Sequence, residues 1–416
     1  MSRHRVWKRL LDVEHTVIEQ VVLEGEEGAE TVVVGVRPTR SQQGRCSRCG
    51  GKAARYDNGG GRRRWRGLDL GSTIVELEAD APRVRCRLDG VVVAAVPWAR
   101  PGSRFTRSFE QQCAWLAAQC AGSAVAELMR VAWRSVTAIV ERVVADALGS
   151  RDLLAGVTRV GIDEVAYRKG QRYLLAVTDH DTGRLIWAAK GRDQATVEAF
   201  FEALGPERAA AITHVSADGA EWIHAAVRAK APQAVICLDA FHTVAWATRA
   251  LDEVRRRQVA ELRAAGAVDT AAGLKGTRWA LLKNPGDLTM LQRTSLAGIA
   301  RLNGPLYRAY LLKEQLRAVF AAKGEQGRQL LAGWLAWAKR SRLPAFVKLA
   351  ATIERYKPLI LNTLDHGLSN ARSEATNVHL RTLTRRAYGF HSPEALIAMA
   401  MLTRGGCCPP LPGRAA

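Results

Sequence analysis

The chain has 416 residues, of which 48% are hydrophobic and 24% are charged, a composition that excludes wholesale disorder. No run of about 18 apolar residues occurs, which excludes a typical membrane-spanning helix, and 8 Cys are too few for a disulfide framework. Lys and Arg number 61 against 40 Asp and Glu, so the formal net charge is +21. The expected partner is therefore a nucleic acid rather than a membrane, because each Lys or Arg on a phosphate gains from counterion release.

Length and the N-terminal segment indicate the class of protein. At about 150 residues per domain, the chain should contain two or three domains. The first residues, MSRHRVWKRL, are basic and lack the apolar segment of a signal peptide. We therefore expect a cytoplasmic protein, associated with the nucleoid if its partner is DNA.

Residues 1–105 are expected to form a small β-rich module, in which short apolar runs alternate with basic, Gly-rich loops. The β-like runs are residues 31–36, 73–78 and 91–96. A zinc-finger-like pattern lies within the module and consists of Cys46, Cys49, Cys86 and Asp89. This pattern predicts a Zn²⁺ site with one carboxylate ligand. The alternative is a β-ribbon that keeps its shape by packing alone.

Residues 106–150 read as a helix-turn-helix domain. Ser123 and Ser135 are candidate N-caps of its last two helices. Apolar residues recur at helical spacing in the second of these, at Val136, Ile139, Val140 and Val143. If this helix enters a major groove, Arg134, Ser135 and Thr137 at its start face the DNA. The alternative is a helical hairpin with no such role.

Residues 151–246 alternate between β-like and helical periods. The expected strands are residues 157–168, 172–179, 184–190, 212–217 and 234–238, with helices over 194–204 and 220–229. This β-β-β-α-β-α-β order predicts a mixed sheet with helices packed on it.

The remainder is mostly helical. Residues 247–362 form the expected helical insertion, with breakers at 284–286 and 303–305. Residues 363–404 include a helix over 373–386, and the Pro- and Gly-rich tail 405–416 is expected to be disordered.

Basic clusters and Trp residues outside these motifs have less specific interpretations. Residues 62–66 and 255–257 are rich in Arg, and each cluster either contacts phosphate or is a solvated face. Six Trp residues are expected in the core rather than on bases: Trp187, Trp222, Trp246, Trp279, Trp334 and Trp337.

Four carboxylates have positions typical of a metal site. Asp163 lies inside an apolar strand, where burial is costly unless the group is paired or holds a metal. Asp218 and Asp239 close two later strands, and ligands collect at the carboxyl ends of strands in open α/β sheets. His242 follows Asp239 by three positions, and Glu374 opens the late helix.

Each of these residues has a simpler interpretation on its own. Asp163 could face water on an edge strand, Asp218 and Asp239 could be helix N-caps, and Glu374 could compensate a helix dipole. Together, acidic residues from adjacent strand ends and a distant helix can hold two Mg²⁺ ions, with Mn²⁺ as a substitute. Two such ions about 3.5–4 Å apart promote phosphodiester chemistry.

The same residues carry a resemblance to a known family. The motifs are Gly161-Ile-Asp-Glu164, Gly191-Arg-Asp193, Ser216-Ala-Asp-Gly219, Asp239-Ala-Phe-His242, Glu374-Ala-Thr-Asn377 and Arg386-Ala-Tyr-Gly-Phe390. In this order, from about residue 40 to about residue 403, the chain resembles the ISL3 family of insertion-sequence transposases. The resemblance implies an α/β fold with an RNase H-like mixed-sheet catalytic core and a helical insertion before the final Glu.

The resemblance also implies roles for individual residues. Asp163 and Glu374 match the first and last residues of a DDE site, and Asp218 matches the second. Asp239 with His242 matches an accompanying Asp-x-x-His signature, although Asp239 as the second catalytic carboxylate stays open. At Asp89 the family pattern has Cys, which is a departure of this chain.

The implied function is DNA transposition. The enzyme would bind terminal inverted repeats, hydrolyse phosphodiesters with Mg²⁺ and transfer strands to target DNA as a homodimer or higher assembly. Arg385 and Arg386, after the late helix, would hold the scissile strand. Two alternatives remain: a non-catalytic, transposase-derived DNA-binding protein, and a metal-dependent nuclease with the same core.

Overall fold

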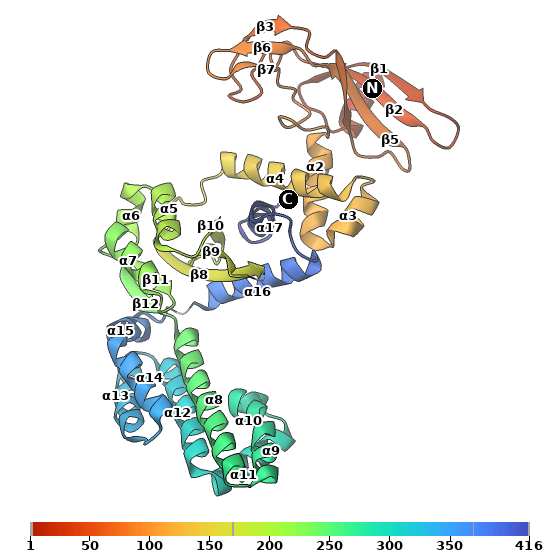
Figure 1. Ribbon diagram of the computed structural model, residues 1–416. Coiled ribbons are helices and arrows are strands. Elements are labelled where there is room, and N and C mark those ends of the chain that lie inside the picture. Colours follow the sequence, from red (N-terminus) through yellow and green to blue (C-terminus); the bar gives the residue numbers. More distant parts are fainter. Residues whose placement is uncertain (1–2, 169, 369, 415–416) are drawn as a thin grey trace. The chain divides into compact units, whose positions relative to one another are not determined.

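The computed structural model describes residues 3–168, 170–368 and 370–414. The chain divides into two compact units, and Figure 1 labels the helices and strands of both. The first unit comprises Met1–Leu153 and Leu383–Ala416, and the second comprises Leu154–Thr382.

The N-terminal part of the first unit is β-rich, as expected. After α1 (Arg3–Leu10), one sheet has the order β1-β2-β5-β4 and a smaller sheet has the order β3-β6-β7. The strands are β1 (Thr16–Glu24), β2 (Thr31–Pro38), β3 (Ala54–Asp57), β4 (Arg62–Arg66), β5 (Ile74–Asp80), β6 (Arg83–Cys86) and β7 (Gly90–Val93). Trp65 and Trp98 pack edge to face in its core, with ring centroids 5.6 Å apart.

Three helices follow in the first unit, and a fourth returns to them from the end of the chain. They are α2 (Arg107–Gln119), α3 (Gly122–Leu128), α4 (Trp133–Ser150) and α17 (Pro393–Arg404), which packs on α4 and α2. The apolar stripe of α4 is buried as predicted. The predicted N-caps Ser123 and Ser135 are wrong, because α3 and α4 begin earlier, at the caps Ala121 and Ala132. Both Ser residues therefore lie within the first turns.

The second unit contains a five-stranded mixed sheet of order β10-β9-β8-β11-β12. Its strands are β8 (Arg159–Arg168), β9 (Arg172–Asp179), β10 (Leu185–Lys190), β11 (His214–Ala217) and β12 (Val235–Leu238). The hairpins β8-β9 and β9-β10 are antiparallel, whereas β8, β11 and β12 are parallel. This arrangement confirms the mixed sheet predicted from the strand order and is consistent with the RNase H-like core that the resemblance implies.

Helices cover the two faces of this sheet differently. On one face, α5 (Gln194–Leu204), α6 (Pro206–Ala211) and α7 (Glu221–Lys230) bury apolar side chains that include Val160 and Ile162. The other face carries α16 (Ala371–Arg386), whose Ser373 lies 2.7 Å from Thr178 on β9. Gly161 and Asp163 point to the α16 side, because side chains alternate along a strand. The short helix α6 was not anticipated.

The helical insertion lies between β12 and α16. It contains α8 (Ala240–Ala264), α9 (Val268–Gly276), α10 (Arg278–Leu282), η1 (Pro285–Asp287), α11 (Met290–Leu302), α12 (Gly304–Ala322), α13 (Gly324–Arg340), α14 (Pro344–Arg355) and α15 (Lys357–His366). Trp334 and Phe346 are fully buried in its core. Trp279 contradicts the expectation of a core position, because its side chain is 59% exposed.

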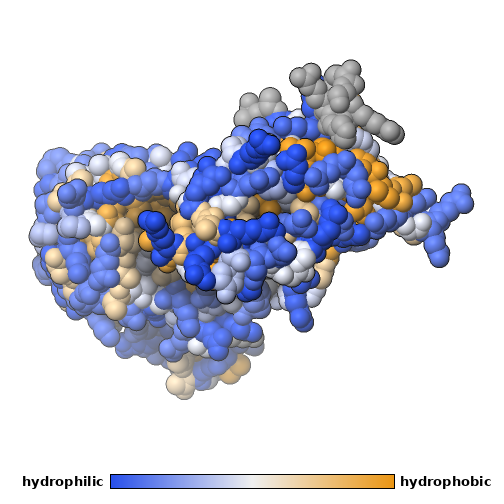
Figure 2. Space-filling model, turned by 90° about the horizontal axis from the view of Figure 1, so that it is seen from above, coloured by the Kyte–Doolittle hydropathy of each residue, from blue (hydrophilic) through white to orange (hydrophobic). Residues whose placement is uncertain are grey.

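The C-terminal segment after α17 packs within the first unit. Residues 405–414 contain no helix or strand, yet Cys407 is buried and Arg151 donates a 2.8 Å hydrogen bond to the carbonyl of Gly406. The beginning of the expected disordered tail is thus packed. Figure 2 shows a largely hydrophilic face with smaller hydrophobic areas. Among the described residues, no helix has the length and apolar character to cross a membrane.

Candidate active site

Three Asp residues lie at one level of the central sheet. On β11, Ser216 is opposite Gly161 of β8, and Ala217 is opposite Leu238 of β12. Continuing these parallel registers places Asp163, Asp218 and Asp239 side by side across three neighbouring strands. Within β8, alternation directs Asp163 toward the side that carries α16. Asp218 and Asp239 directly follow β11 and β12, and the negative charges of both act on the pKa of Asp163.

Asp163 is the most deeply placed of the proposed metal ligands. Its side chain is 4% exposed and accepts hydrogen bonds from the Asn377 amide at 2.7 Å and from the backbone N–H of Glu164 at 2.8 Å. Burial raises the pKa of Asp163 to about 7, and the neighbouring carboxylates of Asp239 and Asp218 act in the same direction. A carboxylate in such surroundings gains from a bound cation.

Asp239 is paired within the protein. It is 1% exposed, is the N-cap of α8, and lies 2.6 Å from Nδ1 of His242. The hydrogen bond from Asp239 raises the pKa of His242 to about 9, so the imidazole is protonated near neutral pH. The N-cap interpretation of Asp239 is therefore confirmed, and its charge is balanced by an imidazolium.

Asp218 has a different environment. It is half-buried, and one carboxylate oxygen accepts a 2.9 Å hydrogen bond from the backbone N–H of Ala220. Ala220 is the N-cap of α7, so Asp218 is not that cap. The second oxygen of Asp218 has no hydrogen-bond partner in the described part of the chain. Of the two strand-end Asp residues, Asp218 thus has the freer carboxylate.

Glu374 approaches the same place from the first turns of α16. Burial raises the pKa of Glu374, and the negative charge of Asp239 raises it further. The charge of His242 acts in the opposite direction. The charges of Asp239 and His242 both act on Glu374, which is consistent with a position of this carboxylate near the end of β12. The five residues expected at the active site therefore gather in one region of the second unit.

Polar contacts fix α16 to the sheet beside these carboxylates. Ser216 donates a 2.8 Å hydrogen bond to Asn370 and lies 2.7 Å from Nε2 of His180. Ser373 lies 2.7 Å from the hydroxyl of Thr178. A Cβ on Gly161 would overlap Ser373 and lie 2.9 Å from Asn370 Oδ1. Glycine at position 161 is what allows α16 to come this close.

The donor set fits hard divalent cations. Asp163, Asp218 and Glu374 offer carboxylate oxygens, and a buried amide oxygen of Asn377 has no hydrogen-bond partner within the described residues. These ligand atoms do not form a tight group. In the described chain, only one set of at least three Asp, Glu, His or Cys residues has its ligand atoms within 4.8 Å of one another, and that set lies in the first unit.

The tight group is the expected zinc-finger pattern in the first unit. The ligand atoms of Cys46, Cys49, Cys86 and Asp89 all lie within 4.8 Å of one another. Asp89 is 3.2 Å from the sulfur of Cys46 and 3.5 Å from that of Cys86. Backbone N–H groups of Asp89 and Leu88 lower the pKa of Cys86, which favours the thiolate. Four converging ligands, three of them thiols, fit tetrahedral Zn²⁺.

The predicted DNA-contacting residues lie at the start of α4. Arg134 is exposed, with its guanidinium 5.8 Å from the ring centroid of Trp133, whose side chain is also exposed. Ser135 and Thr137 are half-buried. This end of α4 therefore presents a basic and an aromatic side chain to solvent.

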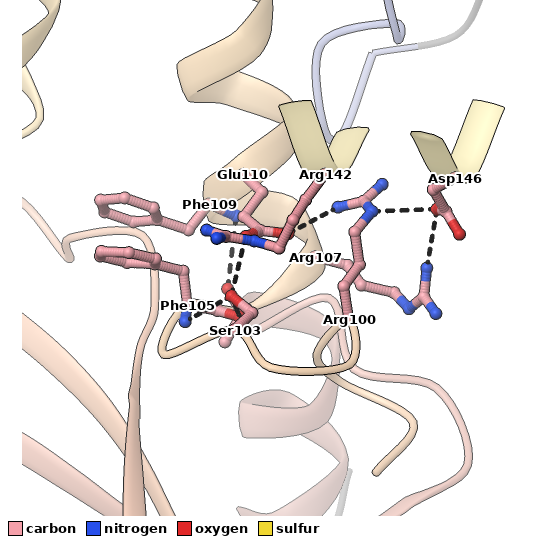
Figure 3. Close-up of polar contacts among 9 residues, drawn as sticks. Arg100, Ser103, Phe105, Arg107, Phe109, Glu110, Arg142 and Asp146 are labelled. Carbon is pink, nitrogen blue, oxygen red and sulfur yellow. Dashed lines mark hydrogen bonds and ion pairs between the residues drawn. The ribbon is translucent and has the colours of Figure 1, made fainter. Parts of the chain in front are cut away.

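A buried ion-pair cluster holds α4 against α2 (Figure 3). Glu110 is fully buried and accepts hydrogen bonds from Arg142 and Ser103 at 2.7 Å and from Arg100 at 3.1 Å. Arg100 also reaches Asp146 at 2.9 Å. Sequence patterns gave no sign of this cluster, because its members come from a loop and two helices.

Arg385 and Arg386 differ in their surroundings. Arg386 donates hydrogen bonds to the C-terminal carbonyls of α2, at 3.0 Å to Ala117 and 3.3 Å to Gln119. This contact gives Arg386 a structural role that the sequence analysis missed. Arg385 is exposed and stays a candidate for contact with DNA.

Comparisons with known proteins agree with this arrangement of elements. Residues 160–400 match the DDE transposase family of the ISL3 type, residues 94–144 match the helix-turn-helix domain of ISL3 transposases, and residues 42–88 match the zinc-finger of transposases IS204/IS1001/IS1096/IS1165. A transposase for insertion sequence element IS1557 of Mycobacterium tuberculosis is 50% identical, covering 100% of this chain and 98% of the relative. A transposase for element IS1001 of Bordetella parapertussis is 28% identical, covering 89% of this chain and 90% of the relative.

Proposed function

We propose, since the chain belongs to the ISL3 family of insertion-sequence transposases, that Asp163, Asp218 and Glu374 are its catalytic carboxylates and that they bind Mg²⁺. The observation that carries this proposal is the alignment of Asp163 with Asp218 across β8 and β11, with Glu374 brought in by α16. Carboxylate oxygens are the ligands that Mg²⁺ prefers, and Mn²⁺ accepts the same set.

We assign the second catalytic position to Asp218 rather than to Asp239. The carboxylate of Asp239 is occupied by the first turn of α8 and by His242, whereas Asp218 keeps one oxygen free of protein partners in the described chain. Asp239 then has a positioning role: it holds His242 protonated beside the carboxylates. The positive charge of His242 attracts a phosphate group to this part of the site.

The residues of the site suit phosphodiester hydrolysis followed by strand transfer. Bound divalent ions in such sites activate the attacking oxygen and stabilise the leaving oxygen. The carboxylates of Asp163, Asp218 and Glu374 would hold such ions, with Asn377 orienting Asp163 by its amide hydrogen bond. Water is the first attacking group at the element end, and the released 3′-hydroxyl is the second. No side chain becomes covalently attached to DNA.

The first unit supplies recognition of DNA. We propose that Arg134, Ser135 and Thr137 at the start of α4 contact the terminal inverted repeats in a major groove, and that Arg385 contacts the scissile strand. Cys46, Cys49, Cys86 and Asp89 would hold Zn²⁺, which would stabilise the β-rich module. Because two element ends are processed together, the active form is a homodimer or a larger assembly on double-stranded DNA, in the cytoplasm at the nucleoid.

Cleavage of a labelled duplex that carries an element end tests the catalytic assignment. Asp163→Ala, Asp218→Ala and Glu374→Ala should each abolish Mg²⁺-dependent cleavage while binding of the duplex is retained. Glu207→Ala, which changes an exposed carboxylate on α6, is the control and should leave cleavage unchanged. Full activity of Asp218→Ala together with inactivity of Asp239→Ala would reverse the assignment of the second carboxylate.

Two further outcomes separate transposition from the alternatives. A strand-transfer product on a plasmid target would reject a simple nuclease. Specific binding of element ends, with no cleavage in either Mg²⁺ or Mn²⁺, would instead identify a non-catalytic DNA-binding protein.

A further inference from the structure

The helical insertion contains a cleft whose charged lining residues are all basic. The cleft has a volume of about 410 Å³ and lies where α8, α9 and α10 meet. Its charged lining residues are Arg255, Arg256, Arg263, Lys275 and Arg278. The uncharged lining residues are Val259 and Ala260, which lie on α8 between these Arg side chains.

No acidic residue of the described chain lines the cleft, and one nearby carboxylate is shared by three of its Arg residues. Asp252 is 2.7 Å from Arg255, 3.4 Å from Arg256 and 3.8 Å from Arg278, so one carboxylate serves three guanidinium groups. Arg263 and Lys275 are exposed and have no ion-pair partner in the described chain. Like charges gathered in one cleft repel one another, and a bound anion would relieve this repulsion.

Part of the cleft is held in a fixed geometry. Arg255 is buried and binds Asp252 through two nitrogens, at 2.7 and 2.9 Å. Arg278 packs its guanidinium 5.3 Å from the ring centroid of the exposed Trp279. Because Asp252 holds Arg255 in place, the guanidinium of Arg255 loses less side-chain entropy on binding a ligand than a free one.

The spacing of the basic residues suits an extended anion rather than a single phosphate. Arg256, Ala260 and Arg263 follow one another at helical spacing on one face of α8. Seven residues of helix span about 10 Å, whereas phosphates of one DNA strand are about 3.4 Å apart along the duplex axis. The row on α8 can therefore lie along several consecutive phosphates.

We propose that this cleft of the helical insertion binds the DNA backbone independently of sequence. It is a second DNA contact, separate from the helix-turn-helix and zinc-finger modules of the other unit. The proposal rests on DNA as the substrate, but it requires neither the carboxylates nor cleavage. The proposal about the cleft can therefore be tested by DNA binding even if the protein does not cleave DNA.

The experiment is the salt dependence of DNA binding by the full-length protein in buffer without Mg²⁺ or Mn²⁺. Two probes are used, a short duplex that carries an element end and one of unrelated sequence. The double variant Arg256→Gln/Arg263→Gln should make the plot of log affinity against log salt less steep, by about 2 units of slope for both probes. At about 0.1 M salt, the affinity for both should fall by roughly 10- to 100-fold.

The matched control is Arg257→Gln. Arg257 is an exposed Arg on the same helix, pairs with Glu261 at 2.7 Å and does not line the cleft. Its substitution should leave the slope within experimental error of the unsubstituted protein. Lys275→Gln on α9 should lower the slope by about 1, which guards against a local defect in α8.

Two results would overturn the proposal. One is a slope for the double variant and for Lys275→Gln equal to that of Arg257→Gln. The other is a loss of affinity confined to the element-end duplex, because a backbone contact must affect both probes alike. Circular dichroism melting of each variant shows whether the insertion is still folded, and only variants with an unchanged melt are compared.

Discussion

Asn377 on α16 donates a hydrogen bond of 2.7 Å to Asp163 on β8, and both side chains are buried. This bond joins β8 to the helix that carries Glu374, although the helical insertion separates the two in the sequence. It orients one oxygen of Asp163, while the backbone N–H of Glu164 holds the other. If Asp163 binds metal as proposed, loss of Asn377 should weaken metal binding, because the amide no longer orients that carboxylate.

We predict that Asn377→Ala lowers cleavage of element ends by about 10- to 100-fold, the usual cost of removing a residue that orients a metal ligand. The concentration of Mg²⁺ that gives half-maximal cleavage should rise as well. Val378→Ala, at the exposed neighbouring position of α16, is the control. If Asn377→Ala cleaves like Val378→Ala at every Mg²⁺ concentration, the hydrogen bond has no part in positioning Asp163.

Gly161 provides a second test of how α16 is placed. Gly161→Ala introduces a Cβ that overlaps Ser373 and crowds Asn370, so α16 must move away from the sheet. We predict a loss of about 1–3 kcal/mol in the free energy of unfolding, together with reduced cleavage. Ser373→Ala removes the atom that overlaps and should restore part of both losses in the double variant. Additive effects in this double-mutant cycle would contradict the contact.

The sequence predicted the catalytic core well because its signals are local. The strands over 172–179 and the helix over 194–204 match β9 and α5 in the structure. Asp163, Asp218 and Asp239 were recognised because each interrupts or closes an apolar run. Their common level in the sheet follows from the parallel register of β8, β11 and β12, which the strand order implied.

What the sequence could not predict depends on contacts between distant segments. Trp279 has a large, mostly apolar side chain, and a core position was therefore expected. It lies on the short helix α10, which does not bury it, and its ring is exposed beside Arg278. The pairing of Arg386 with the end of α2 joins parts of the chain that no spacing rule connects. Helix starts were misplaced at Ser123 and Ser135, because here the caps are Ala residues without a side-chain hydrogen bond.

The ion-pair cluster around Glu110 leads to a prediction about stability. Glu110→Ala removes a fully buried carboxylate, which leaves Arg142 without its ion-pair partner and Arg100 with Asp146 alone. The free energy of unfolding of the first unit should fall by about 3–5 kcal/mol. Asp146→Ala, at the exposed end of the same cluster, should cost at most about 1 kcal/mol. Chemical denaturation measures both, and equal losses would show that burial of Glu110 is not what matters.

His180 predicts a dependence of stability on pH. Burial lowers the pKa of His180 to about 4, with the nearby Arg372 acting in the same direction. The unfolded chain, with a His pKa of about 6.5, therefore binds a proton that the folded chain does not. This contribution to stability is present above about pH 6.5 and is lost as the pH falls toward 4.

We predict that the His180 contribution lowers the free energy of unfolding by about 2 kcal/mol between pH 7 and pH 5. His180→Gln keeps a polar group near Ser216 but does not titrate, so the fall in stability over this pH range should be smaller by that amount. His391→Gln, a His in the first unit, is the control. Urea denaturation at the two pH values measures the difference, and identical pH dependence in all three proteins would reject a neutral, buried His180.

The zinc-finger ligands give the last prediction, which concerns metal identity. Asp89 replaces one thiolate of a four-ligand site by a carboxylate, and thiolates bind Zn²⁺ more strongly than a single carboxylate does in structural sites. The purified chain should contain one Zn²⁺, which a chelator removes with loss of structure in the β-rich module. Asp89→Cys should resist the chelator longer, and Cys86→Ala should lose the metal.

Cys120→Ala, which changes a thiol outside the cluster, should retain the zinc content of the unsubstituted protein. Elemental analysis of the four proteins, before and after chelation, makes the comparison. Equal zinc content in Cys86→Ala and Cys120→Ala would show that the metal lies elsewhere.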